Sequence, residues 1–397
     1  TLSPFPVQGA KEGMAQAVSL QKISIQTKLV AAADQFGPIS EGNVGEYLKY
    51  LPGLSVDYNA NDARGVSLRG LNTSFTVVAV DGTPMAASSS VDTTRRFEFE
   101  QIAMNNVETT ELFKTVTPDI PASATGGFVN FVTKSAFDRQ DASIFSYDLS
   151  FVVPSTNVAF GRETGVWGSD AEYVIRPNLD LNYARRINEK IGFNINYRFS
   201  ERYDDSPRTE ITWNQATPAS AAAATLWTNP RMTQYNVRSE QKLTHREAFA
   251  GKLDYHISDR TKLIVAGQWN WYDLLFNQRG PQLFLGAGST TSGGDNPTFS
   301  SAGAANVRND ILFRNKYGTT VHFNTTLSHA FDDRSKAWLT AYWSHADGQY
   351  RDKTKGLISS TANLNPGLIT DISLANATTA DLPAISLANG GTPVPLR

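Results

Sequence analysis

Long stretches in which apolar and polar residues strictly alternate constrain the fold of this chain more than any other feature. In Ile191–Ser200 every second residue from Ile191 onward is apolar, and the residues between them are Gly, Asn, Arg and Ser. A period of two places each set on one face of a β-strand. Globular strands usually run about five to six residues, whereas a strand tilted across a bilayer needs about nine to eleven. The length of the alternation therefore favours membrane-crossing strands.

The alternation recurs in Phe145–Val153, Asn178–Arg185, Phe249–Ile257, Leu263–Tyr272 and Val321–Phe331, and in a weaker form in Ala337–Ser344. Tight polar turns are predicted at Ile187–Lys190, Ser258–Thr261 and Asp332–Ser335, and long loops over about 154–172, 205–245 and 276–316. An up-and-down barrel with short turns at one mouth and long loops at the other has this rhythm. A soluble β-sandwich is less favoured, because its turns come every 8–12 residues. We expect residues 141–397 to form the first seven or so strands of an antiparallel transmembrane β-barrel, with further strands after Arg397.

Composition excludes several classes of chemistry. The 397-residue chain has a formal charge of −2 and no cysteine, which removes disulfides, thiolate metal sites and cysteine nucleophiles. It shows no basic stripe for nucleic acid and no apolar run long enough for a transmembrane helix. His256 and His322 occupy polar positions of alternating strands and are expected to face the barrel interior as solvated side chains, with metal contact as the alternative. We expect no enzyme activity, cofactor or metal.

Residues 40–138 have a different, mixed character. Asn43–Tyr58 predicts a short helix with one apolar face, ended by Pro52-Gly53 and followed by a strand. Gly65–Asn72 contains Arg69-Gly70. Thr76–Pro84 is a strand that runs into Asp81-Gly82, a hairpin-turn signal. Phe113–Lys134 contains Gly126-Gly127 ahead of an alternating strand with Asn130.

Taken in order, these four elements resemble the plug domain of TonB-dependent outer-membrane receptors. Each element alone is a weak signal, and the order and spacing together carry the resemblance. It implies an α+β plug over residues 40–138, a complete barrel of 22 strands, and a transporter in the outer membrane of a Gram-negative bacterium. Its loops would be extracellular and its turns periplasmic. The implied partners are TonB with ExbB and ExbD, outer-membrane lipid and a transported solute.

One departure from the usual plug pattern bears on the solute. Many plugs carry an Arg-Gly pair at the point where Val107–Ser123 places Lys114. This version resembles a subgroup typified by receptors of Xanthomonas and Caulobacter, often associated with carbohydrate import. We therefore expect an oligosaccharide or similar polar solute, with a ferric siderophore as the alternative and a passive porin-like channel as a less favoured one. Solute-stacking aromatic side chains are expected in the second long loop, at Trp213, Trp227 and Tyr235.

The first 39 residues are expected to be an extension ahead of the plug. Its start contains two prolines, which forbid a helix. The resemblance implies that such a short extended segment holds the TonB box, which pairs with TonB as an added strand. A disordered tail is the alternative. The expected TonB-binding residues are Thr1, Leu2, Ser3, Pro4, Phe5, Pro6 and Val7.

Overall fold

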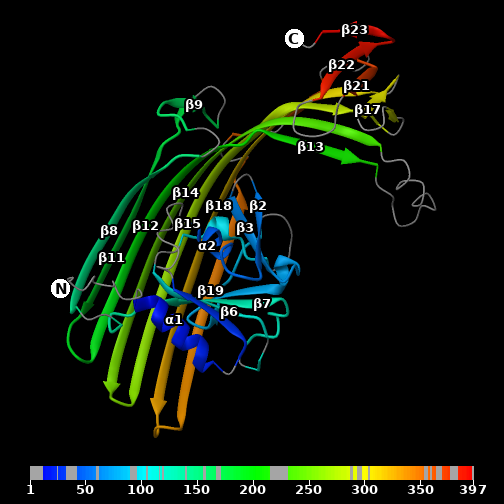
Figure 1. The fold of residues 1–397 in the computed structure, drawn as a ribbon. Helices are drawn as coiled ribbons and strands as arrows, with labels where there is room; N and C mark the ends of the chain where they lie inside the picture. Colours follow the sequence, from blue (N-terminus) through cyan, green and yellow to red (C-terminus); the bar gives the residue numbers. More distant parts are fainter. Residues whose placement is uncertain are drawn as a thin grey trace, which may run out of the picture.

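A curved sheet of long antiparallel strands wraps around a small N-terminal domain in the computed structural model (Figure 1). The structure describes residues 12–24, 26–32, 43–59, 62–89, 96–103, 106–115, 117–118, 120–138, 141–154, 158–166, 171–214, 231–286, 289–292, 297–302, 305–352, 356–357, 360–363, 369–375 and 383–395. No helix within these ranges is long and apolar enough to cross a membrane.

All seven predicted long strands are present and pair in chain order. They are β8 (Ser143–Val152), β11 (Arg176–Arg186), β12 (Ile191–Asp205), β14 (Met232–Ser258), β15 (Thr261–Phe284), β18 (Asn306–Ala330) and β19 (Lys336–Tyr350). Each pairs antiparallel with its neighbour. We call this the long-strand sheet. The prediction of antiparallel strands joined by alternating short and long connections is confirmed.

The predicted long loops at 205–245 and 276–316 are partly wrong. Much of both segments is strand, because β14 already begins at Met232, β15 continues to Phe284 and β18 begins at Asn306. The extensions pair with each other and with two shorter strands, β13 (Arg208–Trp213) and β20 (Ser360–Asn363). Their polar composition hides the apolar alternation, while the backbone pairing continues regardless of side-chain polarity.

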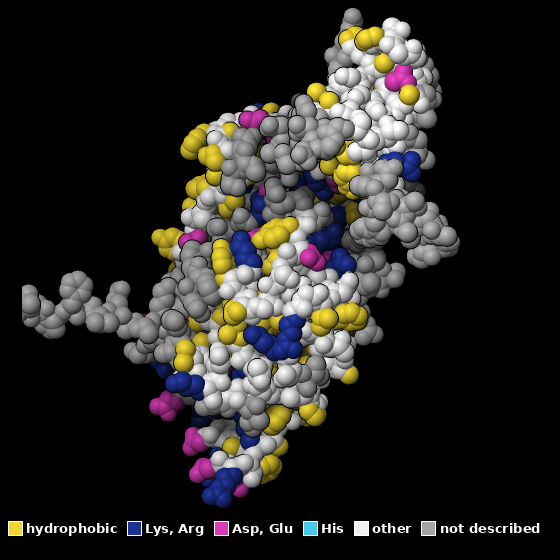
Figure 2. Space-filling view, turned by 45° about the vertical axis from the view of Figure 1, so that its right-hand side comes forward, with side chains coloured by type: hydrophobic (Ala, Val, Ile, Leu, Met, Phe, Trp, Pro, Cys, Tyr) yellow, Lys and Arg dark blue, Asp and Glu magenta, His cyan; other side chains and the backbone are white. Residues whose placement is uncertain are grey.

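The three tight turns lie together at the lower end of the long-strand sheet (Figure 1). Charged side chains gather at this end in the space-filling view (Figure 2), as expected for the polar, exposed turns at Asn188–Lys190, Asp259–Arg260 and Asp332–Arg334. The connections between β12 and β14 and between β15 and β18 lie at the opposite end.

The two faces of the long-strand sheet differ in polarity. On the outer face, Ile195, Gly251, Gly267, Phe323 and Trp343 face one another in register across five strands. Six residues further along each strand, about 20 Å by strand geometry, a second register row is polar. This row, which we call the polar belt, contains Glu201, His245, Asp273, Tyr317 and Gln349. The inner face of the central strands is polar, and the N-terminal domain covers part of it.

A small five-stranded sheet caps the end opposite the tight turns. Its strands are β16 (Thr290–Ser292), β17 (Thr298–Ser301), β21 (Asp371–Ala375), β22 (Ala384–Asn389) and β23 (Thr392–Val394). One face packs on the long strands through an apolar cluster that includes Tyr235, Leu283 and Phe299. A two-stranded ribbon, β9 (Arg162–Thr164) with β10 (Ala171–Tyr173), lies between β8 and β11 in the chain.

The N-terminal domain is built on a mixed sheet of five strands in the order β1-β6-β7-β4-β5, in which β4 and β7 run parallel. Its elements are α1 (Glu12–Ile23), β1 (Lys28–Ala32), α2 (Val44–Leu48), the hairpin β2 (Leu54–Asn59) and β3 (Asp62–Leu68), β4 (Thr76–Val80), β5 (Thr83–Pro84), β6 (Val107–Phe113) and β7 (Gly127–Thr133). Because β1 pairs with β6, a boundary at residue 40 is too late: the sheet begins inside the segment expected to be an extension.

The helix predicted ahead of Pro52 is α2. Asn43 caps it by accepting a hydrogen bond from the backbone N–H of Gly45, and its apolar face is buried. The chain then turns at Gly53, whose φ is +91°, a left-handed conformation that glycine adopts without steric cost.

Candidate functional site

Three cations from the long-strand sheet point at the N-terminal domain. Lys242 and Arg246 lie four residues apart on β14, so strand geometry places both on the same, inner face. Lys316 reaches the same region from β18. All three side chains are buried. Isolated buried cations would be very costly, so acidic partners are expected opposite them.

The N-terminal domain supplies those partners. Asp62 begins β3 and forms an ion pair with Arg246, and its Oδ2 lies 3.2 Å from the Nζ of Lys242. Glu100 lies in the short 3₁₀ helix Phe99–Gln101, and its carboxylate is 2.9 Å from the Nζ of Lys316 and 3.7 Å from that of Lys242. We call this group the interface charge cluster. Its members are Asp62, Glu100, Lys242, Arg246 and Lys316.

Further hydrogen bonds fix the acids in place. Asn43, the cap of α2, donates to Asp62 over 2.5 Å. Arg246 also donates from Nε to the backbone carbonyl of Glu100 over 2.5 Å. Arg64 on β3 pairs with Glu98 at 2.7 Å, beside Glu100. Each acid is therefore held by groups of its own domain as well as by the sheet. A buried charged group needs such paired, charge-assisted hydrogen bonds to be stable.

Burial and ion pairing oppose each other at these carboxyl groups. Burial alone would raise the pKa of Glu100, but the nearby Lys316, Lys242 and Arg64 hold that pKa down to about 2. Burial likewise acts to raise the pKa of Asp62, and Arg246 and Lys242 overcome it and hold the pKa well below its usual range. Both groups are charged at neutral pH, so the two parts of the chain are held together by ionic contacts sealed from water.

A second contact lies nearer the tight turns. The turn Asp81-Gly82 between β4 and β5 touches the sheet through Lys252 of β14, whose Nζ donates to the carbonyl and hydroxyl of Thr133 at 3.0 Å and lies 3.8 Å from Asp81. Thr83 shares a 2.9 Å hydrogen bond with the Nε2 of His322 on β18. His322 thus faces inward, as its polar position predicts. His256 does the same and stacks on Phe137 at 4.2 Å between ring centroids.

Residues 22–128, which include most of the domain bounded by these contacts, match the family model described as "TonB-dependent Receptor Plug Domain". This part of the chain is therefore similar to the plug domain of TonB-dependent receptors, and we call it the plug. No curated protein matches the chain. The interface charge cluster therefore joins a plug to the inner face of the sheet around it.

Solved structures similar to this chain were also found. A variant of the ferric enterobactin receptor of Pseudomonas aeruginosa is 11% identical, with a TM-score of 0.41, over 95% of this chain and 61% of its own length. The siderophore receptor PirA of Acinetobacter baumannii is 11% identical, with a TM-score of 0.36, over 94% and 67%. The ferric citrate transporter FecA is 12% identical, with a TM-score of 0.37, over 92% and 63%. This chain thus spans about two thirds or less of each of these structures.

The plug motif residues predicted from the sequence fall into two groups. Gly53 and Arg69 meet directly, since the N–H of Arg69 donates to the carbonyl of Gly53 over 3.0 Å. Lys114 lies beside them, its Nζ 3.8 Å from where a Cβ of Gly53 would stand. Arg69 is exposed, so its side chain needs no buried partner. The motif Pro52-Gly53 thus closes on Arg69-Gly70 across the hairpin β2–β3.

The second group holds the turn of β4. The Oδ1 of Asn130 accepts from the N–H of Gly82 over 2.7 Å, and Asp81 accepts from the N–H and hydroxyl of Thr133 at 2.9 and 2.6 Å. Asp81 and Gly82 have φ of +48° and +79°, the positive pair that a type I′ turn requires. Gly126 and Gly127 pack closely against Phe75 and Leu68.

The remaining predicted site residues are the TonB-binding segment and the three aromatic residues expected to stack on the solute. The segment Thr1–Val7 and Trp227 lie outside the described residues. Trp213 ends β13, is 40% exposed and packs edge-on against Phe299 at 5.3 Å. Tyr235 is not in a loop: it lies in β14 and is only 3% exposed within the apolar cluster. Contact between Tyr235 and a solute is therefore a wrong prediction, caused by reading the polar start of β14 as a loop.

Sequence reasoning missed the interface charge cluster. A signal was available, because Lys242 and Arg246 are cations at inward positions of one strand, four residues apart. Their acidic partners could not be found this way. Asp62 and Glu100 are 180 and 216 residues away from Lys242 and Lys316, and only folding brings them together.

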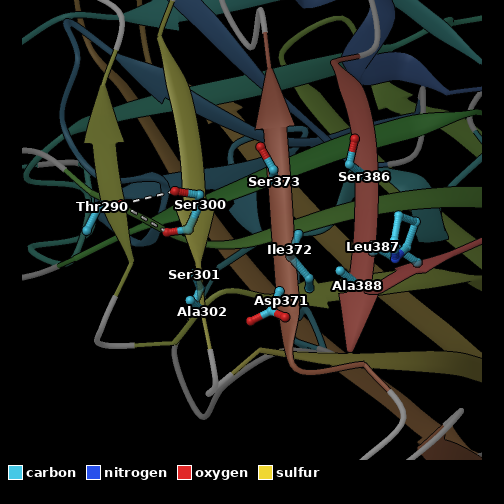
Figure 3. A pocket seen from close by; sticks show the side chains of 11 residues that line it. Thr290, Ser300, Ser301, Ala302, Asp371, Ile372, Ser373, Ser386, Leu387 and Ala388 are labelled. Atoms are coloured by element: carbon cyan, nitrogen blue, oxygen red, sulfur yellow. Dashed lines mark hydrogen bonds between the residues drawn. The ribbon is translucent and has the colours of Figure 1, made fainter. Parts of the chain in front are cut away.

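A hollow of about 480 Å³ lies on the small five-stranded sheet, at the end of the chain's fold opposite the tight turns (Figure 3). Four hydroxyl side chains on neighbouring strands face one another in register there, Thr290, Ser300, Ser373 and Ser386. Asp371 adds a carboxylate to the lining. Ile372, Leu387 and Pro393 also line the hollow, so it combines hydrogen-bonding groups with apolar surface.

Proposed function

We propose that this chain is the N-terminal part of an active transporter of the bacterial outer membrane, in which TonB supplies the energy through the plug. The observation that carries the proposal is a plug seated in the concave face of the sheet and held by buried ion pairs. A plug so held would close the passage to a solute until work is done on it. This argues against a passive porin-like channel. TonB would act with ExbB and ExbD.

The outer face of the sheet supports the membrane location. Large apolar side chains are exposed there, among them Phe323, Trp343 and Leu339, which a bilayer would cover. The polar belt bounds this apolar zone at one end, and the charged tight turns bound it at the other end. Strands with this pattern are typical of outer-membrane barrels. In the proposed orientation the tight turns are periplasmic and the small sheet is extracellular.

The solute class is proposed as an oligosaccharide or a similar polar compound. Three features support it: the Lys114 version of the plug motif, the exposed ring of Trp213, and the four hydroxyl side chains in the lining of the hollow on the small sheet. Sugar rings stack on aromatic faces, and their hydroxyls pair with side chains of this kind. The structures named above are of receptors for iron chelates, so a ferric siderophore is the second candidate.

The test is to replace Thr1–Val7 in the full-length receptor by seven Gly and Ser residues, which keeps the chain length. If this segment is the TonB box, uptake should be lost while solute binding to cells stays near normal. Unchanged uptake would place the TonB contact elsewhere. Induction by a glycan supports the carbohydrate assignment, whereas induction by iron starvation together with competition from a siderophore would overturn it.

A further inference from the structure

Strand β1 is the first part of the plug sheet that a pull on the N-terminal segment would reach. It has five residues, lies at the edge of the sheet and pairs antiparallel with β6, beginning with Lys28 opposite Phe113. Helix α1 packs beside it through Ala17, Val30 and Ala32. A short edge strand held along one side can leave a sheet without disturbing the strands beyond its neighbour, unless side chains connect them.

Side chains do connect them here. The Nζ of Lys28 is 2.6 Å from the Oε1 of Glu111 on β6. The other carboxylate oxygen of Glu111 accepts from the Nδ2 of Asn130 on β7 over 3.0 Å. The carboxamide oxygen of Asn130 in turn accepts from the N–H of Gly82 over 2.7 Å. Three successive contacts therefore lead from the edge strand across the sheet to the turn at the end of β4.

That turn contacts the inner face of the long-strand sheet through Lys252 and His322. Asp81, next to Gly82, binds Thr133, and Thr133 receives both hydrogen bonds from Lys252. Thr83, on the other side of Gly82, shares its hydrogen bond with His322. One continuous series of polar groups therefore runs from Lys28 on β1 to Lys252 and His322 on the inner face of the long-strand sheet.

Each link in this chain depends on the one before it. The carboxylate of Glu111 is largely buried, with 13% of its side chain exposed, and Lys28 is the cation on it. When β1 leaves, a buried unpaired carboxylate is costly, and the vacated edge offers it water. Glu111 then turns away from Asn130, and the carboxamide loses the partner that orients it toward Gly82.

We propose that Lys28, Glu111 and Asn130 form a relay through which displacement of β1 loosens the Asp81–Thr83 turn from the barrel wall. The relay rests on the proposed function only in taking the pull on β1 to come from TonB. Its consequence is that the plug lets go of the wall at the turn before its sheet unfolds. Lys28 and Asn130 are positioning residues in this device, and neither needs to touch the solute.

The relay can be tested without TonB or solute, by hydrogen exchange of backbone amides in the full-length receptor in lipid. Lys28→Met should raise the exchange rate of the Gly82 amide by about tenfold, the factor expected for loss of roughly one hydrogen bond. Lys28→Arg should restore slow exchange, because it keeps the cation on Glu111. Asn130→Leu should give the faster exchange directly, whatever residue occupies position 28.

Lys49→Met is the matched control, since it removes a plug ion pair, with Glu46 at 2.8 Å, that lies outside the relay. It should leave the Gly82 amide unchanged. The amides of α2 report whether the plug remains folded in every variant. The relay is overturned if Lys28→Met accelerates exchange only in β1 and β6, or if Lys28→Met and Asn130→Leu have additive effects on Gly82. Either result would leave the proposed transport intact, because that is tested by the replacement of Thr1–Val7.

Discussion

Asp62 and Arg246 form an ion pair in which neither side chain has any exposed surface, and 184 residues of chain separate them. One belongs to the plug and the other to the wall of the sheet. An ion pair removed from water loses more on separation than an exposed pair does, because breaking it leaves buried charges behind. The contact therefore opposes separation of the plug from the sheet, and it favours one position of the plug over others.

Removing one partner of this pair should weaken the seating of the plug. We expect Arg246→Met to cost about 3–5 kcal/mol, the range for breaking a buried pair, seen as easier urea-induced release of the plug in limited proteolysis. The double variant Asp62→Leu/Arg246→Met should regain part of this loss, because no unpaired partner of that pair remains. Lys49→Met, in an exposed pair, should cost less than about 1 kcal/mol. Equal losses in Arg246→Met and Lys49→Met would contradict the structure.

Acid should release the plug in a defined pH window. The pKa of Glu100 is held down to about 2 and that of Asp62 is also lowered. Groups whose pKa is lowered by folding stabilise the folded state above their unfolded pKa of about 4, and that stability is lost as the pH falls toward the folded pKa. The protection factors of the plug amides, which correct exchange rates for their intrinsic pH dependence, should thus be constant from pH 7 to about 5 and fall below about 4. Glu100→Gln should flatten this fall. A fall centred near pH 6 would implicate other groups.

Two of the positive-φ glycines of the plug, Gly82 and Gly127, should differ sharply in tolerance to substitution. A Cβ at Gly127 would stand 2.2 Å from a methyl group of Leu68, with φ at +149°, whereas a Cβ at Gly82, with φ at +79°, meets nothing within 4 Å. Gly82→Ala should therefore cost only backbone strain, about 1–3 kcal/mol. Gly127→Ala should add overpacking of about 1–3 kcal/mol or more. Thermal unfolding of the plug in the two variants compares them, and the reverse order would count against the close packing of β7 on β3.

The outer face of the sheet should reject charge most strongly in the middle of the apolar zone. Phe323→Arg should cost about 2–4 kcal/mol in a bilayer. Thr319 lies on the same face of β18, next to the polar belt, and Thr319→Arg should cost about 0–1 kcal/mol. Refolding equilibria of the full-length receptor in lipid vesicles would measure both. Similar costs at the two positions would mean that the polar belt is not near a membrane surface.

Trp213 should contribute to solute binding if the solute is a glycan. Loss of a stacking contact should weaken binding of the inducing glycan by more than roughly 1 kcal/mol in Trp213→Ala. Trp343→Ala is the matched control, because its ring lies on the outer face of the sheet and is 57% exposed. Calorimetric titration of the two variants separates the effects. Unchanged binding in Trp213→Ala would remove the support that this residue gives to the carbohydrate assignment.

The sequence alone determined the local elements of this chain. Alternation of apolar and polar residues predicts all seven long strands, more weakly for β19, because a period of two can bury one face only as a strand. The turn Asp81-Gly82 and the helix end at Pro52-Gly53 also follow from local steric preferences. The prediction failed where strands continue into largely polar segments, as at the start of β14 around Tyr235, since backbone pairing needs no apolar alternation in the sequence.

The tertiary structure alone decided which distant residues meet. Asp62, Glu100, Lys242, Arg246 and Lys316 look like ordinary solvated charges along the chain. Their burial is a property of two surfaces placed together, because the energy of an ion pair depends on the distance between the charges and on the exclusion of water, and sequence spacing specifies neither. The relay from Lys28 to Gly82 has the same origin: its contacts run across strands whose order in the sheet differs from their order in the sequence.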